Sequence, residues 1–166
     1  LEQQLSVYPM PDQATVDEML EKELAALGKK IVVLDDDPTG VQTVNHVYVY
    51  TDWTKESIRA GFEDEQPIFF VLTNSRSFTA NQTEQVHTEI ANTVVDVAQE
   101  TGKDFIIVNR GDSTLRGHYP LETEVLRKTI EDRTGEKIDG EVLMPFFKEV
   151  TSPVLIPRTS YWPMPG

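Results

Sequence analysis

Short apolar runs that alternate with helix-like segments constrain the fold of this chain most. The runs are rich in Val, Ile and Phe, which is typical of buried strands, and the segments between them repeat apolar residues at helical spacing. Such alternation favours parallel strands joined by right-handed crossovers. We therefore predict an α/β fold with an open, mainly parallel, Rossmann-like sheet and helices on both faces.

The predicted elements come directly from these patterns. The predicted strands are residues 30–34, 47–50, 67–72, 104–108 and 141–144. The predicted helices are residues 13–27, 54–62, 80–100 and 120–132. Thr79 with Gln82, and Thr15 with Glu18, have the spacing of capping boxes at two helix starts. The apolar side of the first helix is expected to pack on the domain.

Composition narrows the class of protein. The net charge of −13 argues against a nucleic-acid surface, which needs a basic patch. The chain has no cysteine, which excludes disulfides and thiolate metal sites and is compatible with a cytoplasmic location. No run approaches the roughly 18 apolar residues of a membrane span, so no membrane partner is expected. A homo-oligomer is compatible with these properties.

The chain divides into three expected parts. Residues 1–28 are a leader and a helix, residues 29–149 form the α/β domain, and residues 150–166 are a proline-rich tail that reads as a truncated or discontinuous piece. The first residues lack the basic and apolar pattern of a signal peptide.

Three polar motifs each come directly after a predicted strand, at residues 35–40, 73–77 and 109–118. In open α/β sheets, ligands bind outside the carboxyl ends of the strands. The three motifs are therefore expected to face one crevice. The third motif is the densest, with two arginines, an aspartate, two hydroxyls and a histidine in ten residues, and this combination suits an anionic, hydroxylated ligand.

Three consecutive carboxylates, Asp35, Asp36 and Asp37, come after the first strand. They could supply a general base, accept hydrogen bonds from sugar hydroxyls or bind magnesium. On an extended backbone, Asp35 and Asp37 would share a face. The alternative is turn chemistry, because Asp-Pro-Thr-Gly is also a good turn sequence.

The arginines are the candidates for binding an acid group. Ser75 and Arg76 could hold a carboxylate or phosphate, or Arg76 could instead pair with one of the aspartates. Arg110 and Arg116 are six residues apart, so one can face the ligand while the other is structural, and Arg116 is preferred because glycine flanks it. His118 is a candidate for ligand binding or proton transfer, although such a histidine often packs.

Other sites are not visible in the sequence. The three histidines have no metal-ligand spacing. Neither a Walker-type loop nor GxGxxG occurs, so no nucleotide site is predicted.

The motifs at residues 35–40, 73–77 and 112–118 together resemble the N-terminal domain of the four-carbon acid sugar kinase family. The run Asp-Ser-Thr-Leu-Arg-Gly-His is the most specific part, and the resemblance spans about residues 29–147. It implies a two-domain enzyme that phosphorylates a hydroxyl of a tetronate-like sugar acid with ATP and Mg²⁺, the nucleotide being held by a C-terminal domain.

The resemblance also implies roles for single residues. Asp35 and Asp36 would lie near the substrate hydroxyls, and we expect them to be the catalytic carboxylates, with Asp37 as a substrate-binding residue. Ser75, Arg76 and Arg116 would bind the substrate around its carboxylate. Asp112 and Ser113 would line the same cleft as substrate-binding residues, together with His118. No metal ligand is assigned in this chain.

Because the nucleotide-binding domain is absent, we expect the chain to bind its ligand without turnover. Two alternatives stay open. One is a haloacid-dehalogenase-like, Mg²⁺-dependent phosphatase, because Asp35-x-Asp37-x-Thr39 fits the nucleophile motif of that family. The other is a non-catalytic module that binds sugar acids.

Overall fold

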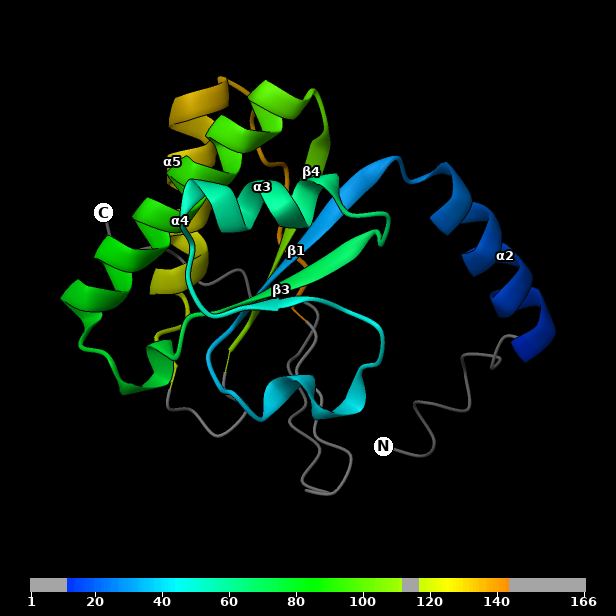
Figure 1. The fold of residues 1–166 in the computed structure, drawn as a ribbon, viewed down its shortest axis with the longest axis horizontal. Coiled ribbons are helices and arrows are strands. Elements are labelled where there is room, and N and C mark those ends of the chain that lie inside the picture. Colours follow the sequence, from blue (N-terminus) through cyan, green and yellow to red (C-terminus); the bar gives the residue numbers. More distant parts are fainter. Residues whose placement is uncertain (1–11, 112–116, 144–166) are drawn as a thin grey trace, which may run out of the picture.

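The computed structural model describes residues 12–111 and 117–143, which form four helices and one parallel sheet (Figure 1). The strands are β1 (Lys29–Asp35), β2 (Val49–Tyr50), β3 (Ile68–Leu72) and β4 (Asp104–Arg110). The helices are α2 (Gln13–Ala26), α3 (Lys55–Glu63), α4 (Ala80–Thr101) and α5 (Leu121–Thr134), with 3-10 turns η1 (Gly40–Thr43) and η2 (Ser75–Ser77). The strand order is β2-β3-β1-β4, and every pairing is parallel. The predicted open parallel α/β fold is confirmed.

The core lies between one face of the sheet and helices α3, α4 and α5. The register pairs Val32 with Phe69 and Leu34 with Val71, so these four side chains share a face. They are buried with Phe62 of α3 and with residues of α4 and α5. Burial of this apolar surface is the main favourable term for the domain.

The opposite face of the sheet is less completely covered. Val33 and Phe70 are buried there, whereas Ile106 and Val108 of the edge strand β4 are partly exposed. In the part of the chain that the structure describes, the helices that pack on the sheet gather on the first face. The expected second helical layer has no counterpart in that part.

Helix α4 forms as its sequence predicts. Thr79 and Gln82 make the capping box, in which the Gln82 side chain accepts from the Thr79 backbone N–H at 2.9 Å. The stripe Ile90, Val94 and Val97 is fully buried. None of the described helices has the length and hydropathy that crossing a membrane would require.

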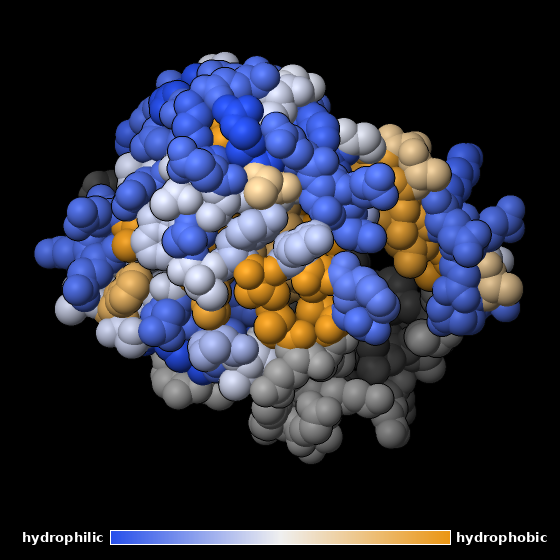
Figure 2. All heavy atoms as spheres, viewed as in Figure 1, coloured by the Kyte–Doolittle hydropathy of each residue, from blue (hydrophilic) through white to orange (hydrophobic). Residues whose placement is uncertain are grey.

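Helix α2 departs from the prediction in its packing. It stands apart from the sheet in Figure 1, and its apolar residues Met19, Leu20 and Leu24 are exposed (Figure 2). Its N-cap is Asp12, which accepts from the Thr15 N–H, so the expected Thr15 capping box was wrong. Periodicity indicates which side chains share a helix face, but it carries no information on whether a partner surface exists.

The predicted fifth strand does not form in the described residues. Residues 141–143 are irregular, Val142 is largely exposed, and residue 144 lies outside the described residues. An apolar run becomes a strand only where a neighbouring strand pairs with it, and local composition does not reveal this.

Two matched leucine substitutions test this packing. Leu126 of α5 is 5% exposed in the core, and Leu20 of α2 is 54% exposed. We expect Leu126→Ala to lower the free energy of unfolding by about 2–5 kcal/mol. Leu20→Ala should change it by no more than about 0.5 kcal/mol, as measured by urea unfolding. Equal losses in the two variants would contradict the exposed position of α2.

Candidate functional site

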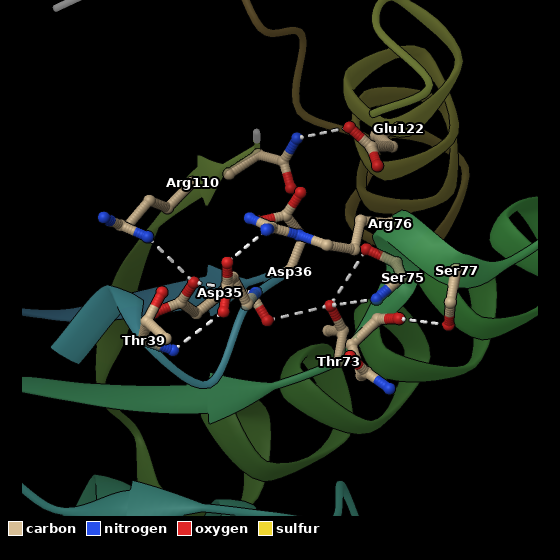
Figure 3. Close-up of polar contacts among 12 residues, drawn as sticks. Asp35, Asp36, Thr39, Thr73, Ser75, Arg76, Ser77, Arg110 and Glu122 are labelled. Atoms are coloured by element: carbon tan, nitrogen blue, oxygen red, sulfur yellow. Dashed lines mark hydrogen bonds and ion pairs between the residues drawn. The ribbon is translucent and has the colours of Figure 1, made fainter. Parts of the chain in front are cut away.

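The polar motifs meet at the carboxyl ends of the strands, as expected from the parallel order. Asp35 ends β1, Arg110 ends β4, and Arg76 lies in the η2 turn after β3. Figure 3 shows side chains from these three strand ends pointing toward one another. Because β1 lies between β3 and β4, its carboxyl end is next to both arginines.

Asp35 is a fully buried carboxylate. The register pairs Asp35 with Arg110 on the same face of the sheet, and Arg110 Nη1 lies 3.0 Å from Asp35 Oδ1. The same oxygen accepts from the Asp37 backbone N–H at 3.1 Å. A buried charge of this kind is stable only when it is paired and hydrogen-bonded. Asp35 therefore holds the turn after β1.

Gly40 closes this turn over the carboxylate. A Cβ added at Gly40 would collide with both Asp35 carboxylate oxygens and with Arg110 Nη1. The Gly40 N–H donates to the Asp37 carbonyl at 2.9 Å, which fixes the chain in this position. Residue 40 must lack a side chain so that the backbone can cover the ion pair.

Asp36 and Asp37 share one arginine. Arg76 Nη2 lies 3.0 Å from Asp36 Oδ1, and Arg76 Nη1 pairs with Asp37 Oδ2. The extended backbone on which Asp35 and Asp37 would share a face does not continue past Asp35, because β1 ends there and the chain turns. Asp37 Oδ1 also accepts from the Thr39 N–H at 2.8 Å, so the turn chemistry weighed as an alternative is present as well.

Ser75 begins the η2 turn, which follows β3 along the chain, and it is buried. Its hydroxyl lies 3.0 Å from the Thr73 hydroxyl, and Thr73 donates from its backbone N–H to the Asp35 carbonyl at 2.8 Å. Asn74 adopts a left-handed conformation, with φ 54°, that lets the chain turn sharply between them. In this arrangement Ser75 supports the position of Arg76.

His118 uses one ring nitrogen to hold two loops together. Its Nε2 donates to the Phe78 carbonyl at 2.8 Å, which links the segment before α5 to the residue after η2. Because that nitrogen is occupied, a proton-transfer role at Nε2 would require this bond to break.

Sequence reasoning missed the buried pair Asn109 and Glu122. Glu122 is almost fully buried and accepts from Asn109 Nδ2 at 3.1 Å, a contact that joins β4 to α5 (Figure 3). The signal was present, because Glu122 is four residues before Leu126 and eight before Ile130, on the stripe that faces the core. A carboxylate in such a stripe indicates a buried polar contact.

The charges of the cluster determine what it can do. The cluster combines three carboxylates with two guanidinium groups. Ionised carboxylates are acceptors only and suit the hydroxyl groups of a sugar. Within residues 12–111 and 117–143, no group of three or more acidic or histidine side chains is arranged to hold a metal ion.

The same geometry speaks against the phosphatase alternative. Its nucleophile would be Asp35, but this carboxylate is enclosed by Gly40 and paired with Arg110. A nucleophile must reach the phosphorus atom of a substrate, which an enclosed carboxylate does not.

A second polar cluster lies at the opposite end of the strands, where β1 and β4 begin. A hollow of about 410 Å³ is lined there by Lys30 and Lys103. Lys30 donates to the carbonyls of Asp64 and Gln66, and Lys103 donates to that of Phe62. Burial lowers the pKa of Lys30, and the charge of Lys103 adds to this effect. These lysines satisfy carbonyls at and just beyond the end of α3, which explains the cluster without a ligand.

The structure thus brings together Asp35, Asp36, Asp37, Ser75 and Arg76, with His118 fixed nearby through Phe78. The remaining predicted residues, Asp112, Ser113 and Arg116, lie outside the described residues. The assignment of each residue to catalysis or substrate binding stays a prediction.

An open parallel α/β sheet with charged side chains at the carboxyl ends of its strands is the architecture of a ligand-binding α/β domain. A family model described as a sugar-binding N-terminal domain matches residues 31–151, which is more than half of the chain. The chain belongs to this sugar-binding family, consistent with its resemblance to the N-terminal domain of four-carbon acid sugar kinases. No curated protein and no solved structure matches the chain.

The close approach of Gly40 to the ion pair is directly testable. We expect Gly40→Ala to lower the free energy of unfolding by about 1–3 kcal/mol, because the added methyl group overpacks the site. Gly140→Ala is the matched control, because nothing lies within 4 Å of its added Cβ. Its effect should stay within about 0.5 kcal/mol in urea unfolding. A tolerated Gly40→Ala would contradict the enclosure of Asp35.

Proposed function

We propose that this chain is the substrate-binding part of an ATP-dependent kinase that phosphorylates a hydroxyl of a four-carbon sugar acid. The observation that carries the proposal is the cluster of three carboxylates and two arginines at adjacent strand ends. The family of the chain supports a sugar ligand. The motif resemblance supports the acid group and the kinase reaction.

The three carboxylates take different parts in this proposal. Asp35 and Asp36 are the most buried, with side chains 0% and 3% exposed, and they form the framework of the site. Asp37 is more accessible and lies beside Arg76, so it presents an acceptor to the ligand hydroxyls. A carboxylate that accepts the proton of a hydroxyl also makes its oxygen a better nucleophile.

The proposed reaction uses ATP and Mg²⁺, and the proposal places their binding outside the described residues. These residues form no metal-binding group, and the sequence has no Walker-type loop. The family resemblance assigns the nucleotide to a second domain, and phosphoryl transfer needs both a held nucleotide and its metal. The proposal includes a cytoplasmic location, with which the cysteine-free sequence is compatible.

Ligand binding tests the sugar-acid part of the proposal. We expect at least one of the four tetronates, D- and L-erythronate and D- and L-threonate, to bind in isothermal titration calorimetry. Asp37→Asn keeps the oxygen that accepts from Thr39 but removes the charge, and should weaken binding about tenfold or more. Asp132→Asn, an exposed aspartate of α5, is the control and should bind as the unmodified chain does. A chain that binds none of the four would refute the proposed ligand.

A turnover assay tests whether the proposed kinase reaction requires a second domain. With ATP, Mg²⁺ and a bound tetronate, we expect this chain to form no phosphorylated sugar acid, because the family resemblance assigns the nucleotide to a second domain and phosphoryl transfer needs a held nucleotide. Phosphorus NMR of the reaction mixture would show the product. Phosphorylation by the chain without any second domain would overturn this expectation, while leaving the binding result intact.

A further inference from the structure

Arg110 is an arginine with unused hydrogen-bonding capacity at the site. It ends β4, its side chain is 45% exposed, and Nη1 pairs with Asp35 Oδ1 at 3.0 Å. Among residues 12–111 and 117–143, its guanidinium has no further partner. A guanidinium presents five N–H donors, so most of this group is available to a ligand.

Arg76, one of the two arginines that the resemblance places at the carboxylate, makes different contacts. Its side chain is 18% exposed, and its two terminal nitrogens pair with Asp36 and Asp37. An acid group approaching Arg76 would have to displace one of these carboxylates or lie against it, and like charges in contact are unfavourable. The geometry therefore favours Arg110 over Arg76 for an anionic group.

The position of Arg110 is fixed before any ligand arrives. Asp35 and Arg110 are register partners on neighbouring strands, so the backbone places the two side chains on one face. Gly40 packs against both the carboxylate and Arg110 Nη1. Asp35 Oδ2 has no partner among the described residues, so Asp35 binds the guanidinium through one oxygen and leaves the rest of the fork open. A planar fork held in this way suits two-point binding of a carboxylate.

We propose that Arg110 binds the carboxylate of the sugar acid and that Asp35 is its positioning residue. This inference rests on the proposed function, because it names the residue that distinguishes an acid from a neutral sugar. It assigns the hydroxyl end of the ligand to the side of Asp37 and Arg76, and the acid end to the side of β4. Asp35 acts through Arg110 and does not touch the ligand.

The test compares each tetronate with its amide, which has the same shape without the charge. Affinities are measured by calorimetry for the unmodified chain, for Arg110→Lys and for the double variant Arg110→Gln with Asp35→Asn. The lysine keeps a cation beside Asp35 but loses the fork, and the double variant leaves no buried charge without a partner. Arg59→Ala is the control, because Arg59 is a partly exposed arginine of α3 that pairs with Glu100, outside the polar motifs.

The unmodified chain and Arg59→Ala should prefer the tetronate to its amide by about tenfold or more. Arg110→Lys should reduce this preference, and the double variant should lower tetronate affinity to the level of the amide. The proposal is overturned if the unmodified chain shows no preference, or if acid and amide lose affinity equally, which a purely structural Arg110 would produce. If no tetronate binds at all, both the role proposed for Arg110 and the proposed function are refuted.

Discussion

The site depends on one ion pair at the end of the central strand, between the buried carboxylate of Asp35 and the half-exposed guanidinium of Arg110. A carboxylate without solvent must be compensated, because an unpaired buried charge is strongly destabilising. The parallel register supplies the compensation, because it places Arg110 directly beside Asp35. The turn after β1 then folds over the pair at Gly40, and this turn carries Asp36 and Asp37 to Arg76.

The packing of the domain leaves this edge of the sheet to polar side chains. Helices α3, α4 and α5 bury one face of the sheet, and the apolar side chains of β1 and β3 end where the polar motifs begin. Hydrogen bonds then fix the strand ends in place, since Thr73 joins the end of β3 to β1 and Asn109 joins β4 to α5. A rigid framework of this kind can hold charged groups without moving when a ligand binds.

The aspartates show that turn chemistry and ligand chemistry can occupy the same residues. Asp37 accepts from the Thr39 N–H with one oxygen and pairs with Arg76 through the other. Asp35 organises the turn and holds an arginine that remains half exposed. The two interpretations of the Asp-Asp-Asp-Pro-Thr-Gly motif are therefore not exclusive, since each carboxylate has two oxygens.

Sequence patterns alone determined the order of the elements, the parallel sheet and the three motifs at its carboxyl edge, because apolar periodicity and capping are local properties. They also identified the sugar-binding family through its motifs. Only the tertiary structure decided that Asp35 is enclosed, that Arg76 is shared by Asp36 and Asp37, and that Arg110 stays accessible. It also decided that α2 stands apart from the sheet with its apolar residues exposed and that Glu122 is buried. These outcomes depend on the register and packing of residues far apart in the chain, which local patterns do not specify.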